Sequence, residues 1–233
     1  MVQHCNNPDT DCRHCELKSP LFCYLKDEEL DLVSKNKNMV VFRKGETICK
    51  QGTQMSQVIS VTSGLAKLYL ESPNQHDSII SIIKPSHFIG GPGIYLDQKH
   101  HYSVTALQDT TVCFIALQLF KELIDENRGF AHELLKEMSK NIISIYNRLS
   151  LLTLKQMPGR MADTLLYLFE EIFQDNKFPL VLSKKDLAGL SGMAKDSAVK
   201  VLREFQHAGI IDYKNNHIVL KNGEALHRIS KTG

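Results

Sequence analysis

Three of the six cysteines lie within twelve residues near the start of the chain, in the stretch CRHCELKSPLFC that contains Cys12, Cys15 and Cys23. Thiolates are soft ligands for zinc and for iron–sulfur clusters, and they are also the reactive groups of redox switches. Cys5 and His14 lie close by and add groups of the same kinds. No second cysteine pair follows at zinc-finger spacing. The stretch therefore indicates a metal site, a thiol redox switch or a chance accumulation of thiols.

The composition predicts a folded protein of the cytoplasm. The chain has 233 residues, of which 42% are hydrophobic, and no apolar run approaches the length of a membrane-spanning helix. The first twenty residues carry Asp, His and Cys where a signal peptide needs an apolar core. A reducing compartment disfavours structural disulfides, so clustered thiols there favour metal binding or redox chemistry. Cys49 and Cys113 lie in apolar sequence, where a small buried side chain is the simpler interpretation.

Short β-rich runs, punctuated by glycine, fill residues 38–118. Apolar residues alternate at Tyr102, Val104 and Ala106, and turn residues recur every eight to fifteen positions. This pattern predicts an antiparallel barrel or double-sheet roll, preceded by a short helix in LKDEELDLVSKN.

The hydrophobic period changes to that of a helix within residues 129–155. Apolar residues recur there in alternating steps of four and three, a pattern that favours pairing with a second copy of the chain over burial within one chain. Pro158 and Gly159 then end or bend the helix. The predicted dimer seam consists of Met138, Ile142, Ile145, Leu149 and Leu152.

The stretch QDNKFP is expected to be a loop, and the sequence LSKKDLAGLSGMAKDSAVKVLREFQHAG that follows it predicts a helix-turn-helix. Ser183 can cap the first helix together with Asp186, and Gly192 suits the turn. IIDYKNNHIVL then predicts a hairpin wing around Asn215 and Asn216. The residues expected in the core are Leu187, Leu190, Ala198, Val201, Leu202 and Phe205.

A local positive charge accompanies this helix pair. From Lys177 to Arg203 six basic residues stand against two acidic ones, and Lys195, Asp196, Ser197 and Lys200 are expected on the solvent side. A basic helix, a wing and a dimer seam together predict half-site recognition, with one helix in each major groove. The predicted domains are residues 1–125 (sensor), 126–155 (dimerisation helix) and 156–233 (DNA-binding domain).

The chain resembles the Crp/Fnr superfamily of bacterial transcription regulators. The matching pieces are KGETICKQG, VTSGLAKLYL, HFIGG, the central helix and the helix-turn-helix with its wing, in the family's order. The resemblance implies an α+β protein with an N-terminal cyclic-nucleotide-binding-like β-roll, a long dimerisation helix and a C-terminal winged helix-turn-helix. It also implies a homodimer that binds promoter DNA and contacts RNA polymerase.

An enzyme and a module that does not bind DNA are the alternatives to a DNA-binding regulator. An enzyme is not expected, because the sequence carries no recognisable nucleophile with its base, no phosphate-cradling glycine loop and no Rossmann fingerprint. The alternative is an effector-binding or scaffold module of the same fold that does not bind DNA.

The expected effector pocket departs from that of cyclic AMP binders. Those relatives carry a Glu after the FIG turn and an Arg before a Ser, whereas this chain has Gly91 after Gly90, and Tyr102 before Ser103. Without the arginine the phosphate would lose a charge-assisted contact of roughly 1.5–3 kcal/mol. Cyclic AMP is therefore not expected, and the pocket is vestigial or adapted to another ligand.

The Fnr branch of the family instead implies an oxygen-labile [4Fe-4S] cluster. The matching residues are Cys12, Cys15, Cys23 and Cys113, although Cys15 and Cys23 are further apart than in the Fnr pattern. The alternatives are a zinc site or thiol switch that also uses Cys5 or His14, or no metal, with a haem or organic effector bound in the roll.

The resemblance also assigns roles at the DNA. Asp196, Val199 and Lys200 match the positions that face base edges, where Asp can accept from cytosine, Lys can approach guanine and Val can contact a thymine methyl. The expected phosphate contacts come from Ser183, Lys184, Lys185, Lys195 and Ser197.

Overall fold

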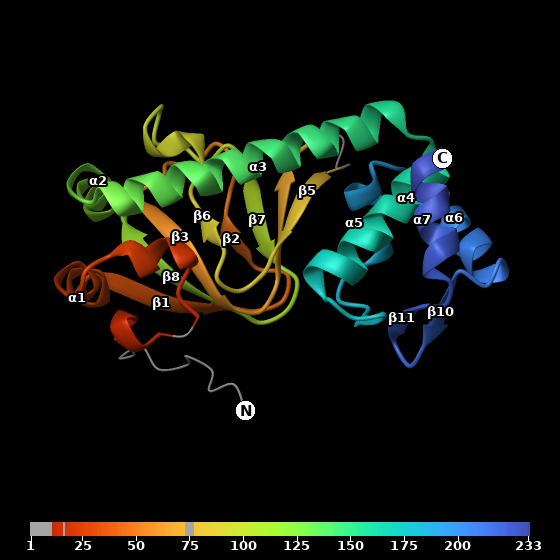
Figure 1. The fold of residues 1–233 in the computed structure, drawn as a ribbon, viewed down its shortest axis with the longest axis horizontal. Helices are drawn as coiled ribbons and strands as arrows, with labels where there is room; N and C mark the ends of the chain where they lie inside the picture. The colour runs from red at the N-terminus through yellow and green to blue at the C-terminus, as the bar shows by residue number, and fades with distance from the viewer. Residues whose placement is uncertain (1–10, 16, 73–76) are drawn as a thin grey trace. The chain divides into compact units, whose positions relative to one another are not determined.

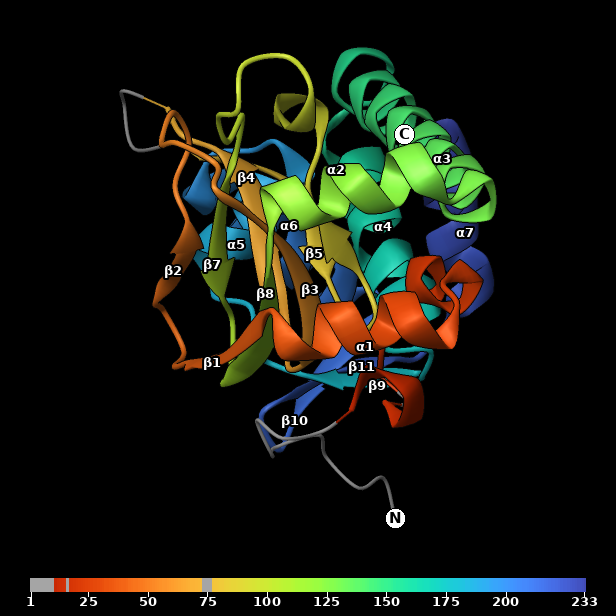
Figure 2. The ribbon, with the colours of Figure 1, turned by 90° about the vertical axis from the view of Figure 1, so that its left-hand side faces the viewer.

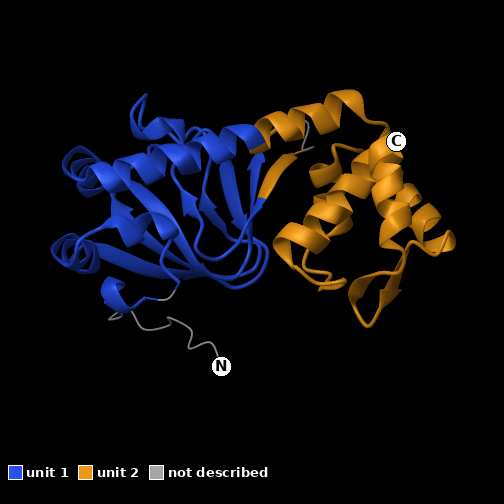
Figure 3. Cartoon of the chain, viewed as in Figure 1, with its two compact units in different colours: residues 1–70, 82–143 blue, residues 71–81, 144–233 orange. Residues whose placement is uncertain are grey.

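The computed structural model describes residues 11–15, 17–72 and 77–233. The fold divides into two compact units, residues 1–70 with 82–143, and residues 71–81 with 144–233 (Figure 3). Within the described ranges, no helix combines the length and the apolar character that crossing a membrane requires.

In the described residues, three short helices precede the first strand, and the last of them is labelled α1 in Figure 1. They are the 3₁₀ helices η1 (Cys12–His14) and η2 (Pro20–Tyr24) and the α-helix α1 (Asp27–Lys35). The Glu29 carboxylate accepts a hydrogen bond from the backbone N–H of Lys26 at 2.7 Å, and three acidic residues in the first turn of α1 complement the helix dipole. The short helix predicted from the sequence is therefore confirmed.

Among the described residues, eight strands form the β-roll as two four-stranded sheets with antiparallel pairing between β1, β8, β3 and β6 and between β2, β7 and β4, which confirms the predicted double-sheet roll. One sheet has the order β1-β8-β3-β6 and the other β2-β7-β4-β5. The strands are β1 (Lys37–Phe42), β2 (Thr47–Cys49), β3 (Gln57–Ser63), β4 (Ala66–Leu70), β5 (Ser78–Ile83), β6 (Phe88–Ile89), β7 (Ser103–Ala106) and β8 (Thr110–Ala116).

Strand β8 separates two hydrophobic clusters. Val112 faces the cluster formed by both sheets, whereas Ile115 faces a cluster built with η2, α1, α2 (Leu117–Glu126) and the start of α3 (Arg128–Leu154). In the second cluster Phe120 stacks on Phe88 at 4.8 Å and meets the edge of Phe130 at 5.3 Å. Figure 2 shows α1 and α2 on the side of the roll that faces the viewer.

Helix α3 ends near the proline predicted to stop it. Its last residue is Leu154, and α4 (Met157–Leu166) begins at once, with Pro158 in its first turn. Proline is tolerated there because the first N–H groups of a helix have no intrahelical acceptor.

The second unit carries the helix-turn-helix and its wing. After α4 and a turn of π-helix (Tyr167–Ile172) come β9 (Lys177–Pro179), α5 (Lys184–Ser191), α6 (Lys195–His207), β10 (Ile211–Lys214), β11 (His217–Leu220) and α7 (Gly223–Thr232). The three strands form one antiparallel sheet with the order β10-β11-β9.

Strand β9 corrects the sequence prediction, which treated QDNKFP as a loop. Phe178 in this strand is fully buried and lies 4.9 Å from the ring centroids of both Phe169 and Phe173. Its neighbour across the sheet is Ile218. The strand is held by these distant contacts, which a three-residue pattern does not reveal.

Candidate DNA-binding surface and sensor sites

The capping box predicted at the start of α5 is present. The Ser183 hydroxyl accepts a hydrogen bond from the backbone N–H of Asp186 at 3.1 Å, and the Asp186 carboxylate accepts one from the backbone N–H of Ser183 at 2.9 Å. These bonds fix where the helix begins. They also engage the Ser183 side chain, although the residue remains exposed.

The turn between α5 and α6 requires a glycine. Gly192 has a left-handed backbone conformation (φ 62°, ψ 41°), and the N–H of the following Met193 donates to the carbonyl of Ala188 at 2.9 Å. A Cβ at Gly192 would overlap the side chain of Leu152 on α3. The glycine therefore allows both the turn and the close approach of α3.

Helix α6 has one buried face and one exposed face. The six core residues predicted for the two helices are all buried, at 0–4% exposure. Lys195, Asp196 and Lys200 are exposed, and Ser197 and Val199 are partly exposed. The predicted DNA-facing residues of α6 thus lie on the solvent side of the helix.

The cations of this surface are free of ion pairs within the described residues. Lys184 and Lys185 on α5 are exposed, as are Lys195 and Lys200 on α6, and none has a carboxylate oxygen within 4.0 Å. Arg203, one turn after Lys200, shares this exposure. Arg203 belongs to the basic segment of the sequence but is not among the predicted DNA contacts. It lies three residues after Lys200, so the two side chains are neighbours on the helix.

The wing forms around the predicted asparagines. Asn215 and Asn216 have positive φ angles of 49° and 60°, as a two-residue type I′ hairpin turn requires, and Lys214 pairs with His217 across the hairpin. Buried Ile218 anchors β11 to the core. The predicted hairpin is confirmed.

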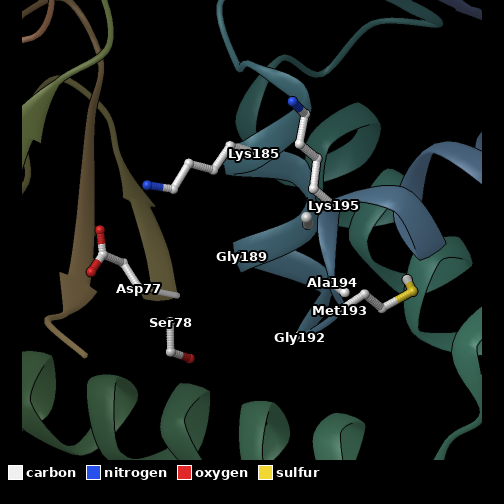
Figure 4. A pocket seen from close by; sticks show the side chains of 9 residues that line it. Asp77, Ser78, Lys185, Gly189, Gly192, Met193, Ala194 and Lys195 are labelled. Atoms are coloured by element: carbon white, nitrogen blue, oxygen red, sulfur yellow. The ribbon is translucent and has the colours of Figure 1, made fainter. Parts of the chain in front are cut away.

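A pocket of about 360 Å³ lies beside the turn between α5 and α6. Lys185 and Lys195 line it, together with Asp77 and Ser78, which belong to the same compact unit. Figure 4 shows the Lys185 ammonium and the Asp77 carboxylate directed into the same space. An acidic side chain therefore faces Lys185, one of the cations predicted to contact phosphate.

The predicted effector residues of the roll lie together and bond to groups of the protein. The Tyr102 hydroxyl donates to the carbonyl of Gly90 at 2.8 Å, and the Tyr102 ring lies against Gly91. Ser103 is fully buried, and its hydroxyl accepts from the backbone N–H of Gln51 at 2.8 Å. Burial raises the pKa of Tyr102, so its hydroxyl stays neutral. At the position that the resemblance matches to the phosphate-binding arginine of cyclic AMP binders, this chain thus has a neutral, hydrogen-bonded side chain.

The predicted cluster cysteines have different surroundings. Cys12 is partly buried, and its backbone N–H donates to Ser34 at 2.7 Å; Cys15 is buried, and Cys23 is exposed on η2. Cys113 is buried on β8, on the strand face that also carries Ile115. Ile115 belongs to the hydrophobic cluster on which Cys12 packs, whereas Cys113 is not part of that cluster.

This arrangement does not form a metal site in the described part of the chain. No three His, Cys, Asp or Glu side chains among residues 11–15, 17–72 and 77–233 are grouped closely enough to hold a metal. His14 is 82% exposed and lies near Asp11, and Cys5 lies outside the described residues. As placed here, the cysteines do not fit the ligand set of an iron–sulfur cluster.

Two family models match the chain, one on either side of α3. A model described as "Cyclic nucleotide-binding domain" matches residues 39–127, and one described as "Crp-like helix-turn-helix domain" matches residues 159–229. The chain belongs to the Crp/Fnr superfamily. The α+β fold expected for this superfamily, with its β-roll, long helix and winged helix-turn-helix, is confirmed.

Known Crp/Fnr regulators match the chain over most of its length. It is 27% identical to the transcriptional activator protein Anr of Pseudomonas protegens, over 96% of this chain and 88% of the relative. It is 22% identical to the fumarate and nitrate reduction regulatory protein of Escherichia coli, over 94% of this chain and 90% of the relative. The structure of FixK2 from Bradyrhizobium japonicum has a TM-score of 0.75 at 20% identity and covers 84% of this chain and 98% of its own. As a Crp/Fnr protein, the chain is a DNA-binding transcription regulator.

Proposed function

We propose that the protein acts as a homodimer that binds a two-fold-symmetric promoter site and contacts RNA polymerase there. The observation that carries this proposal is an exposed apolar face on α3. Ile142, Ile145 and Leu149 are 47%, 53% and 57% exposed in the single chain, and they recur at the spacing of a coiled-coil seam. A contiguous apolar stripe of this kind is typical of a protein interface.

Two residues of the predicted seam also pack within their own chain. Met138 packs against the cluster under the roll, and Leu152 packs against Gly192 of the helix-turn-helix. The exposed part of the seam therefore centres on Ile145. A second copy of α3, related by a two-fold axis, would cover the same residues on both chains.

The exposed residues of α5 and α6 suit the roles proposed for them at the DNA. Asp196, Val199 and Lys200 would face base edges, and the phosphate contacts would come from Ser183, Lys184, Lys185, Lys195 and Ser197. Unpaired lysines can bind phosphate without first breaking an internal ion pair.

Two measurements on the full-length chain test this proposal. Sedimentation of wild-type protein should give a dimer, and Ile145→Glu should give a monomer, because two carboxylates would meet at the seam. Selection from random-sequence DNA should yield a palindrome for the wild type. A monomeric wild type, or selected DNA without two-fold symmetry, would contradict the proposal.

We further propose that the regulator responds to a redox or gas signal through its N-terminal cysteines. The names of two relatives, the fumarate and nitrate reduction regulatory protein and the electron transport regulator A of Shewanella oneidensis, refer to respiratory chemistry. The exposed Cys23 and the partly exposed Cys12 give this signal access to thiols.

Because its partner would be promoter DNA, we place the protein in the cytoplasm. We also propose that it acts by binding alone and catalyses no reaction.

A [4Fe-4S] cluster at the four cysteines stays a prediction. Binding one would require the N-terminal segment to rearrange, because exposed Cys23 and buried Cys113 are not part of one ligand group among the described residues. Iron and sulfide analysis of protein purified without oxygen tests this. A visible absorption band that is lost in air and missing from Cys15→Ser would support a cluster, and iron-free protein with full DNA binding would refute it.

A further inference from the structure

Arg148 is the only buried residue between Asn141 and Ser150 on helix α3, with 9% of its surface exposed. Its neighbours on this part of the helix, including Ile145 and Leu149, face solvent in the single chain. A buried arginine in an exposed stretch requires a specific partner, because burying a cation costs free energy. The partner of Arg148 therefore shows what this buried side of α3 contacts.

The guanidinium of Arg148 binds the carboxyl-terminal end of α5. Nη2 donates to the carbonyl of Gly189 at 2.9 Å, and Nη1 donates to the carbonyl of Leu190. The last carbonyls of a helix lack intrahelical donors and carry the negative end of its dipole. The planar fork of an arginine holds two N–H groups in a fixed geometry toward two neighbouring carbonyls, whereas a lysine offers a compact point charge on a flexible stem.

A second arginine completes this contact from α4. Nη1 of Arg160 donates to the carbonyl of Gly192 at 2.9 Å. Burial lowers the pKa of Arg148 to about 10, with a further contribution from the charge of Arg160, so Arg148 stays charged at neutral pH. Among the described residues no carboxylate lies within 4.0 Å of either arginine, so the carbonyls are the acceptors that the structure provides.

Leu152 extends the same face of α3 by one turn. It lies four residues after Arg148 and packs against Gly192 in the turn before α6. Helix α3 thus has two faces in this region. Ile142, Ile145 and Leu149 form the exposed seam face, and Arg148 and Leu152 hold the helix-turn-helix.

We propose that Arg148 is a positioning residue that sets the angle of the recognition helix α6 relative to the dimer axis. The inference rests on the proposed dimeric function. In a dimer built on α3, the contacts of Arg148 to α5 would determine how far apart the two recognition helices lie. Arg148 would therefore determine the half-site spacing that the dimer accepts.

The test measures spacing preference on the full-length protein. The half-site selected by the wild type is placed in duplexes that contain one copy, or two inverted copies at a series of spacings. Wild type should prefer one spacing. In Arg148→Met the ratio between the affinities for the preferred spacing and for the other spacings should fall about tenfold or more, which is the effect of losing one charge-assisted contact. Its affinity for the single half-site should be retained.

Two variants complete the design. Arg128→Met, at an exposed position on the same helix, should keep the wild-type preference. Arg148→Lys keeps the charge but lacks the rigid fork of donors, so its preference should be intermediate, and it replaces Arg148→Met if that variant does not fold.

The outcomes separate this inference from the proposed function. Equal weakening on every duplex, the single half-site included, would assign Arg148 a merely structural role and overturn the inference. An unchanged spacing preference in Arg148→Met would also overturn it. A wild type without any spacing preference would instead contradict the dimeric function on which the inference rests.

Discussion

The recognition helix α6 and the effector residues predicted in the roll use their polar side chains in opposite ways. On α6, Lys195 and Lys200 are exposed and have no ion pair within the described ranges. In the roll, Tyr102 and Ser103 are bonded to the protein's own backbone. A surface that keeps its donors unpaired is prepared for an external partner. A pocket whose donors bond internally must break those bonds before it can bind a polar ligand.

The largest effect is expected from a change in the turn that connects α5 to the recognition helix α6. Gly192→Ala puts a Cβ into a left-handed conformation and forces Leu152 away, so we expect a loss of about 2–3 kcal/mol in unfolding free energy. Urea unfolding measures it. Gly209→Ala is the matched control, since Gly209 has a similar φ of 67° with nothing within 4 Å. Equal losses in both variants would show that the contact with Leu152 is unimportant.

The second prediction concerns the unpaired cations themselves. Lys200→Ala should weaken binding to the selected palindrome by about tenfold, the value of one good base contact of roughly 1–3 kcal/mol. Titrations at several salt concentrations measure the affinity. Lys44→Ala, an exposed lysine of the roll, should bind like wild type. Equal affinities for the wild type and both variants would show that Lys200 does not contact the DNA.

Local signals explain why most of the DNA-binding surface could be predicted from the sequence. The Ser183 capping box, Gly192 and the Asn215–Asn216 turn each depend on neighbouring residues, so their sequence patterns specify their structure. The β-roll was predicted for a similar reason, because glycine turns and alternating residues mark its strands.

The features that sequence reasoning missed depend on contacts between distant residues. Strand β9 exists because Phe178 fills a space between aromatic rings. Arg148 lies within an apolar repeat, where a polar residue is normally expected to face solvent, and its carbonyl partners are about forty residues away along the chain. Leu152 matched the seam period, yet it contacts Gly192 of its own chain.

The third prediction tests the internal hydrogen bonds of the effector residues predicted in the roll. Tyr102→Phe leaves the buried carbonyl of Gly90 without its donor, and we expect a loss of about 1–2 kcal/mol in unfolding free energy. Thermal or urea unfolding measures this change, and DNA affinity should stay within twofold of wild type. Cyclic AMP should not bind either protein in a calorimetric titration. Binding of cyclic AMP to wild type would show that these residues accept the ligand despite their internal bonds.

The last prediction compares the reactivity of an exposed thiol with that of a buried one. Of the predicted changes, modification of the exposed thiol should affect the fold least. Burial raises the pKa of Cys49 to about 12, so at pH 8 this residue is almost entirely the unreactive thiol. Iodoacetamide should therefore modify the exposed Cys23 in the native protein and leave Cys49 untouched, as measured by mass spectrometry of the digested chain. Unfolding in urea should make both reactive, which controls for intrinsic reactivity. Rapid native modification of Cys49 would mean that the roll opens around β2, and the buried groups of the roll would then be as accessible as the surface of α6.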